Sequence, residues 1–317
     1  MTPSQPSSSS PSSPVSLQQR LRGTGGPTAW GGYGLVGPAL FLFGLFIVFP
    51  MIGTLVDSLH DFGAADPDRR FVGLGNYAEL VEDPVFWGAL KNNLLLLIGS
   101  VVVQVGGGVV LAAVLHRGIR RGRAAYRAVV FAPMIMSVVA VGLLWQLIYY
   151  PSVGILNRVL TAVGAPVPER GWLGDPDLVI LSILIVACWQ YLGFMMVIML
   201  AGMQSIPSEL YEAARLEGAG EVQAFRYITV PGIRNVILIA TLITMIGAFK
   251  VFDLVYVLTL GGPANASQVL GLYLYQNAFT LDRMGYASAL AVVLLLIALG
   301  LGLVQLRLER GKTASAL

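Results

Sequence analysis

The chain has very little cysteine, histidine and charge for its length. Of its 317 residues one is cysteine, two are histidine and 12% are Asp, Glu, Lys or Arg. One cysteine, Cys188, excludes an intrachain disulfide and any cysteine-cluster metal site, and its place in an apolar run fits a small buried side chain. His60 and His116 lie in separate loops, on opposite sides of the predicted membrane, so they form no metal pair or catalytic dyad. The sequence therefore predicts no metal site and no catalytic residues.

The chain is instead rich in long apolar runs. The chain is 56% hydrophobic, far more than a soluble domain. Six runs reach the ~20 residues that a helix needs to cross ~30 Å of hydrocarbon. We therefore predict an all-α polytopic membrane protein with a transmembrane domain at 29–307 and spans near 34–56, 93–115, 128–149, 178–203, 236–260 and 285–304. In the second span, Gly106, Gly107 and Gly108 are expected to let a neighbouring helix approach closely, rather than to bind phosphate.

Both ends of the chain are predicted to be tails. Residues 1–28 are rich in Ser and Pro and cannot bury enough apolar surface to order themselves, so we expect a disordered tail. Residues 308–317 form a short second tail that contains Gly311-Lys312-Thr313. A phosphate loop needs glycine five residues before Gly311, where Leu306 stands, so this chain is not expected to hydrolyse ATP.

The basic residues set the orientation. If both termini are cytoplasmic, the cytoplasmic segments hold 13 of the 20 basic residues and the opposite loops hold 6, together with 11 of the 17 acids. This positive-inside bias predicts cytoplasmic termini and a cytoplasmic loop at 204–235, between the fourth and fifth spans. The basic residues form no stripe that would bind nucleic acid.

The loop at 204–235 is a polar segment between two long apolar runs and holds four of the chain's few carboxylates. Its composition predicts a short helix over Pro207 to Glu217, a stop at Gly218 and Gly220, and a second helical piece from Glu221 to about Val230. Two short helices joined at glycines indicate a docking element. The alternative is an amphipathic helix on the membrane surface, which the mixed charges and the lack of an aromatic-rich apolar face disfavour.

Several motifs resemble one family of transport proteins. The loop contains Glu212-Ala213-Ala214, then Gly218-Ala219 and Ile228-Thr229-Val230-Pro231, and is similar to the coupling loop of permeases in binding-protein-dependent ABC importers. Four further stretches look like the carbohydrate-uptake branch (maltose, multiple-sugar or glycerol-phosphate type) and follow its order: Phe71-Val72-Gly73-Leu74-Gly75-Asn76-Tyr77, Gly154-Ile155-Leu156-Asn157, Thr259-Leu260-Gly261-Gly262-Pro263 and Gly285-Tyr286-Ala287-Ser288-Ala289.

The resemblance implies a heteromeric machine in the bacterial cytoplasmic membrane. This chain would pair with a second homologous permease within the lipid. Two copies of a cytoplasmic ATPase would bind ATP and Mg, and an extracytoplasmic binding protein would deliver a sugar or oligosaccharide. The coupling residues carried over are Glu212, Ala213, Ala214, Gly218, Ala219 and Pro231.

The fifth predicted span is the only one that contains charges. Lys250 and Asp253 are three residues apart, which predicts one helical face, with Tyr256 a further turn along. We expect a solute path bordered by Phe249, Lys250, Asp253 and Tyr256, with Gln190 and Tyr191 as weaker candidates. The alternative is a salt bridge that only stabilises the bundle. Asn93, Gln104, Gln146 and Asn277 are expected to form hydrogen bonds between helices.

Two other classes of membrane protein need residues that this chain lacks. An intramembrane enzyme would need converging acid, base, nucleophile or metal-binding groups, and a proton-driven transporter would need a titratable relay over several spans. Lys250 and Asp253 alone supply neither. Within the importer class, glycerol phosphate or another polar solute remains an alternative to sugar.

Overall fold

A computed structural model describes residues 29–66, 68–117 and 122–313. The predicted tail at 1–28 and the last four residues of the other tail lie outside this description. Two compact units, Met1–Gly53 and Thr54–Leu317, make up the chain, and each is considered by itself. Across the described ranges the elements are helices apart from two short strands, which confirms the all-α prediction.

The first unit holds most of one apolar helix. It comprises α2 (Ala29–Phe43), the π-helical η1 (Gly44–Val48) and the start of α3 (Phe49–Asp57). Val36–Asp57 is long and apolar enough to cross a membrane, close to the predicted 34–56. The π-helical stretch comes just before Pro50, which has no N–H to donate to the previous turn.

The second unit begins with a small hairpin and the second span. Strands β1 (His60–Asp61) and β2 (Arg70–Phe71) are antiparallel, and α4 (Gly75–Glu82) follows them. The span consists of α5 (Pro84–Ser100), η2 (Val101–Gly106) and α6 (Gly107–Arg117). It starts at Pro84, nine residues before the predicted start at 93, because the polar Lys91, Asn92 and Asn93 interrupt the apolar pattern without ending the helix.

The third predicted span is not one straight helix. It divides into α7 (Arg123–Ile135) and α8 (Val138–Ile148), which meet at 99°. Ser137 is extended and accepts a hydrogen bond from the N–H of Ala140 at 3.2 Å, so it caps a new helix. The predicted span at 128–149 therefore consists of two helices, and it is one span if the bent pair is counted together.

The central helix and the polar loop come next in the chain. After α9 (Ile155–Ala162), α10 (Val179–Gln204) forms the fourth span. The loop holds α11 (Ser208–Leu216) and a second helical run, and α14 (Arg234–Phe249) lies at 68° to that run. The run consists of α12 (Glu221–Ala224), η3 (Phe225–Thr229) and α13 (Val230–Gly232).

The chain ends with short helices followed by a long one. These are α15 (Asp253–Thr259), α16 (Leu270–Tyr275), η4 (Gln276–Thr280) and α17 (Met284–Thr313). The helix α17 continues beyond the predicted end at 304 and into the predicted tail. In the described ranges four helices are long and apolar enough to span a membrane, or six spans if each bent pair counts as one.

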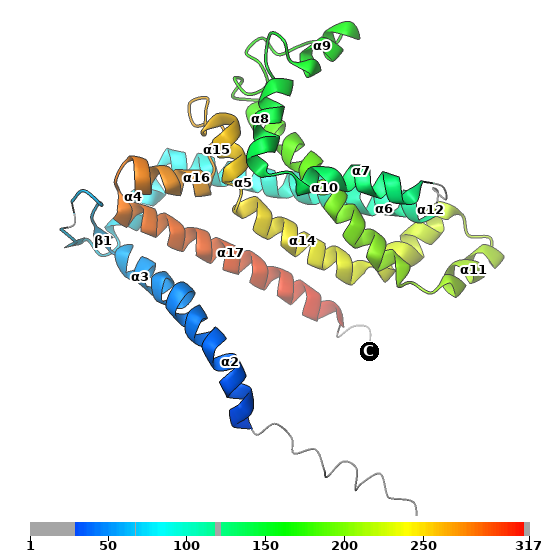
Figure 1. The fold of residues 1–317 in the computed structure, drawn as a ribbon, viewed down its shortest axis with the longest axis horizontal. Coiled ribbons are helices and arrows are strands. Elements are labelled where there is room, and N and C mark those ends of the chain that lie inside the picture. The colour runs from blue at the N-terminus through cyan, green and yellow to red at the C-terminus, as the bar shows by residue number, and fades with distance from the viewer. Residues whose placement is uncertain (1–28, 67, 118–121, 314–317) are drawn as a thin grey trace, which may run out of the picture. The chain divides into compact units, whose positions relative to one another are not determined.

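Small residues let the spans pack around α10 (Figure 1). A Cβ on Gly108 of α6 would lie 2.9 Å from Cβ and 3.0 Å from the carbonyl carbon of Met195 in α10. A Cβ on Gly193 would meet the carbonyl oxygen of Val130 in α7. The predicted close approach at the three glycines is thus confirmed at Gly108, whereas Gly106 faces open space.

Amide side chains fix the segments around α5 and α15. Asn93 donates to the carbonyl of Ala248 at 3.0 Å and accepts from the N–H of Leu270 at 2.8 Å. Asn92 donates to the carbonyls of Ala266 and Gln268, both at 2.9 Å. Gln146 of α8 donates to the carbonyl of Val257 at 2.6 Å. The predicted interhelical role of Asn93 and Gln146 is therefore confirmed.

Candidate functional site

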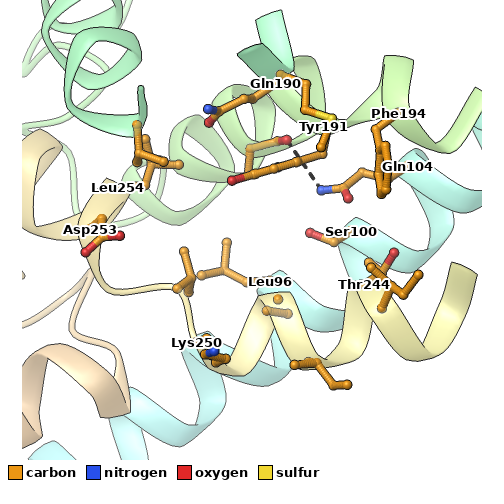
Figure 2. Close-up of a pocket in the computed structure, with 18 of the residues that line it drawn as sticks. Leu96, Ser100, Gln104, Gln190, Tyr191, Phe194, Thr244, Lys250, Asp253 and Leu254 are labelled. Atoms are coloured by element: carbon orange, nitrogen blue, oxygen red, sulfur yellow. Dashed lines mark hydrogen bonds between the residues drawn. The ribbon is translucent and has the colours of Figure 1, made fainter. Parts of the chain in front are cut away.

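A cavity of about 510 Å³ lies where two helices are interrupted. Its walls come from α5 and η2, from α10, from α14 and from the segment that leads into α15 (Figure 2). Met134 and Val138, on either side of the break between α7 and α8, also line it. The interrupted backbone and the polar side chains thus occur at one place.

Lys250 and Asp253 line this cavity but do not lie on one helix. The helix α14 ends at Phe249, and α15 begins at Asp253. The prediction of a continuous helix over 236–260, with both charges on one face, was wrong. A lysine at a helix C-terminus and an aspartate in a first turn each match the helix dipole, which favours an end and a start at these residues. Figure 2 shows the two side chains on successive parts of this break.

The two charges make no ion pair with each other. In the described ranges neither side chain takes part in an ion pair or a hydrogen bond. The alternative of a self-paired salt bridge within the bundle is therefore not what the structure shows. Both residues are exposed to the cavity or to solvent, so each charge is available to a ligand.

Polar side chains from α10 and η2 face the same cavity. Gln190 of α10 is 1% exposed, its amide nitrogen donates to the carbonyl of Met136 at 3.4 Å, and its buried amide oxygen has no hydrogen bond. Tyr191 also lines the cavity. Gln104 of η2 donates to the carbonyl of Ala187 at 3.4 Å (Figure 2).

Two of the six predicted path residues lie elsewhere. Phe249 is 3% exposed and packs in a core cluster with Leu97 and Ala248. Tyr256 stands on α15 against the rings of Phe252 and Tyr275, outside the cavity wall. The structure brings Gln190, Tyr191, Lys250 and Asp253 together.

Three further residues line the cavity and were not predicted from the sequence: Ser100, Phe194 and Thr244. Ser100 lies four residues before Gln104, and Phe194 lies four residues after Gln190. That helical spacing from an amide side chain was a usable signal. Thr244 has no such relation to Lys250, because the two residues lie six positions apart.

The polar loop forms two helices that are tied together. The predicted helix over Pro207 to Glu217 is present as α11, with Pro207 extended just before it. Gly218 has a φ of +82°, as expected for a helix stop, whereas Gly220 is extended. Tyr211 and Thr229 share a hydrogen bond of 3.0 Å between their hydroxyls, which joins α11 to η3.

Much of the loop's apolar surface is exposed. Leu216 is 90% exposed, Val222 79% and Tyr227 70%. A recess of about 410 Å³ between α11 and the second helical run includes Ala214, Gly218 and Ala219, three of the predicted coupling residues. Glu212 is exposed on α11, and Pro231 lies in α13. The loop therefore leaves a recess and several large apolar side chains exposed.

A mainly apolar cavity that carries a few polar side chains at helix breaks, within a set of apolar spans and with a structured polar loop beyond them, is typical of a membrane transport subunit. Residues 104–313 match the family described as "Binding-protein-dependent transport system inner membrane component". The chain belongs to this family. It is a multi-pass membrane protein and the permease component of such a transport system, which confirms the resemblance seen in the sequence.

Two relatives and one solved structure show how far the likeness extends. The chain is 45% identical over 271 residues (85% of this chain, 92% of the relative) to the probable ABC transporter permease protein YurN of Bacillus subtilis. It is 33% identical over 279 residues (88% and 93%) to the trehalose/maltose transport system permease protein MalF of Thermococcus litoralis. Its fold matches a chain of a bacterial alginate ABC transporter, crystallised with an alginate-bound periplasmic protein, at TM-score 0.79 and 24% identity, over 94% of this chain and 98% of that one.

Proposed function

We propose that this chain forms, with a second permease, the translocation path of an ATP-driven importer of a sugar or oligosaccharide. The observation that carries the proposal is the cavity at the helix breaks, where the charges of Lys250 and Asp253 and the buried amide oxygen of Gln190 lack protein partners in the described part of the chain. A solute rich in hydroxyls can both accept from and donate to such groups. The relative named for trehalose and maltose transport supports a carbohydrate.

A neutral solute fits the cavity better than glycerol phosphate, the main alternative. A phosphate group would be attracted by Lys250 but repelled by Asp253, and both line one cavity of about 510 Å³. A sugar hydroxyl can donate to the carboxylate, and another can accept from the ammonium group. The balance of one cation and one anion therefore favours an uncharged polyol.

The energy source is proposed to be a separate ATPase. Two copies would bind ATP and Mg and dock on α11 and the recess beside it, with no cofactor held by this chain. The exposed Leu216, Val222 and Tyr227 support a protein partner at this surface, because several large apolar side chains exposed on one short loop are typical of interaction sites. Partners on the opposite side would include an extracytoplasmic binding protein.

Variants of the loop test the docking surface. Glu212→Lys places a cation where the partner meets an acid, and Gly218→Pro cannot adopt a φ of +82°. Both should leave insertion intact and uncouple uptake from ATP hydrolysis. Gly220→Ala is the control, since Gly220 is extended and a Cβ there meets nothing within 4 Å. Wild-type uptake and ATPase co-purification in both variants would contradict the docking assignment.

The orientation is proposed from the arginine distribution, with both termini cytoplasmic and the protein in the bacterial cytoplasmic membrane. Ser205 and Ala64 are both exposed, so a cysteine at either position can react with a label. A cysteine at 205 should react only from the cytoplasm, and one at 64 only from outside. The opposite labelling pattern would overturn the orientation.

The whole function is tested by isolating the complex. The chain is purified from its own cells, the bound ATPase, second permease and binding protein are identified, and the solute retained by the binding protein is determined by mass spectrometry. A mono- or oligosaccharide supports the proposal. A phosphate ester or an amino acid would overturn the carbohydrate assignment.

A further inference from the structure

Four aromatic rings form a continuous row that begins at the cavity. Phe252, which lines the cavity, has its ring centroid 5.4 Å from that of Tyr256 and 5.2 Å from that of Tyr275. Tyr256 and Tyr275 are 5.7 Å apart, and Phe279 lies 5.2 Å beyond Tyr275. We call these four residues the aromatic row. It leads from the cavity wall to a ring that is 68% exposed, Phe279.

The row is assembled from two distant segments of the chain. Phe252 and Tyr256 are four residues apart, at the helix break and on α15. Tyr275 and Phe279 are four residues apart, at the end of α16 and in η4. In Figure 1, α15 and α16 lie toward the end of the second unit opposite α11. With the proposed orientation, the row lies on the extracytoplasmic side of the cavity.

The tyrosines of the row differ from structural tyrosines in the same unit. Tyr273 and Tyr286 both donate to the carboxylate of Asp83, and Tyr149 donates to the carbonyl of Ser182 at 3.1 Å. Among the described residues the hydroxyls of Tyr256 and Tyr275 make no hydrogen bond, and neither is a buried atom. A hydroxyl that is accessible and unpaired within the protein can bind a solute.

We propose that the aromatic row is a stacking surface for pyranose rings, over which a sugar passes between the outer end of the permease and the cavity. A pyranose presents C–H groups on its face, which pack on an aromatic ring, and hydroxyls on its rim, which the tyrosines can bind. The inference rests on the proposed function and adds a second contact region, distinct from the charged cavity.

The row can be tested without disturbing the cavity. Tyr275→Ala and Phe279→Ala remove rings, whereas Tyr275→Phe and Phe279→Tyr keep them. Phe71→Ala is the matched control, because Phe71 is also 68% exposed and contacts the ring of His60 alone among the described aromatic residues. Each variant is purified as the full transporter in lipid nanodiscs. Saturation transfer from protein to the C–H protons of trehalose is then measured by NMR, and uptake is measured in cells.

The expected result separates the row from the rest of the site. Removing either ring should lower saturation transfer and uptake at least fivefold, and Phe279→Tyr should stay within twofold of wild type. Tyr275→Phe should fall between these results because it loses only the hydroxyl, and Phe71→Ala should change neither quantity. If Asp253→Asn lowers uptake but the two alanine variants do not, the row is wrong and the cavity stands. Loss of the second permease from the complex would assign the row to the subunit interface instead. Absence of any transfer to trehalose in the wild type, with a bound solute that is not a sugar, would overturn both proposals.

Discussion

Among the described residues of the second unit, charged side chains have protein partners in one region and lack them in another. Between α4 and α17, Glu79, Asp83, Asp282 and Arg283 form what we call the α4–α17 charge cluster, and each has protein partners. Asp83 accepts from the N–H of Val85 at 2.8 Å and from Tyr273 and Tyr286, and Asp282 accepts from the N–H groups of Ala64 and Ala65 at 2.6 and 2.9 Å. At the cavity, Lys250 and Asp253 have no ion pair or side-chain hydrogen bond in the described ranges.

This difference separates charges that join segments of the fold from charges that have no described protein partner at the cavity. A satisfied carboxylate joins segments about 200 residues apart, as Asp83 does for α5 and α17. Charges kept at membrane depth without protein partners are costly and persist where a solute or water meets them. Substitution in the cluster should therefore lower stability, and substitution at the cavity should lower transport with stability retained.

The largest effect is expected at Asp83. Asp83→Ala removes the cap of α5 and leaves two tyrosine hydroxyls without their acceptor, so we expect the free energy of unfolding to fall by about 2–4 kcal/mol. Thermal unfolding of the purified complex measures this change. Glu82→Ala is the control. Glu82 is the exposed residue next to Asp83, so its substitution should change the free energy of unfolding by less than about 0.5 kcal/mol. Equal losses in the two variants would contradict the role of the cluster.

The stability that Asp83 contributes should also depend on pH. Burial alone would raise its pKa, but hydrogen bonds from Tyr273 and Tyr286 and from the backbone of Val85 and Phe86 hold the pKa below its ordinary value. A carboxyl whose pKa is lowered by folding stabilises the protein above its unfolded pKa of about 3.9, and this is lost as pH falls through the folded pKa. Asp83→Asn should therefore flatten the acid limb of the stability curve and leave its neutral region parallel to wild type.

A packing substitution beside the cavity gives the next largest effect. Gly108→Ala would place a Cβ 2.9 Å from Met195 in α10, which lines the cavity, and should cost about 1–3 kcal/mol. Gly106→Ala is the matched control, because a Cβ there meets nothing within 4 Å. The pair shows how much transport is lost when the cavity wall is strained without any change in polar groups. If Gly106→Ala is as unstable as Gly108→Ala, helix propensity rather than packing governs this segment.

The cavity charges should affect transport by about tenfold or more. Asp253→Asn and Lys250→Gln remove one charge each and leave no partner stranded, because the two side chains do not pair. We expect each variant to assemble normally and lose uptake, and the double variant to show additive changes in unfolding free energy within about 0.5 kcal/mol. A coupling energy well above that would restore the salt-bridge interpretation.

The sequence predicted the spans and the loop because both depend on local composition. Apolar runs of about 20 residues identify spans, and Gly218 after an amphipathic nine-residue helix identifies a stop, which its φ of +82° bears out. The close approach at Gly108 was likewise visible, since glycines in a span have few other uses.

The breaks at 136–137 and 250–252 were not predictable in the same way. Apolar residues continue through both, so hydropathy reads one helix where tertiary packing stabilises two. Ser137 as a cap and Lys250 before Asp253 at a helix end and start were local signals that the span-length argument overrode. Because the breaks position the cavity, Thr244 was missed and Phe249 was placed on the path although it is core, whereas the spacing of Ser100 from Gln104 could have identified Ser100.

The smallest effect is expected at the exposed ion pair of the cluster. Arg283 donates to both carboxylate oxygens of Glu79 at 2.6 Å and lies 4.4 Å from the ring centroid of Tyr286, but the two charged side chains are 42% and 51% exposed. Solvent screening limits the contribution of such a pair to the free energy of unfolding to about 0.2–1 kcal/mol. The contact of Arg283 with the ring adds up to about 1 kcal/mol. Glu79→Gln should thus cost less than Arg283→Gln, which loses both contacts, and both should cost less than Asp83→Ala. Arg70→Gln is the control, because its pair with Asp61 at 2.9 Å is more exposed and has no described ring beneath it. If Arg283→Gln lowered the free energy of unfolding as much as Asp83→Ala, solvent exposure would not determine how much each charge of this cluster contributes to stability.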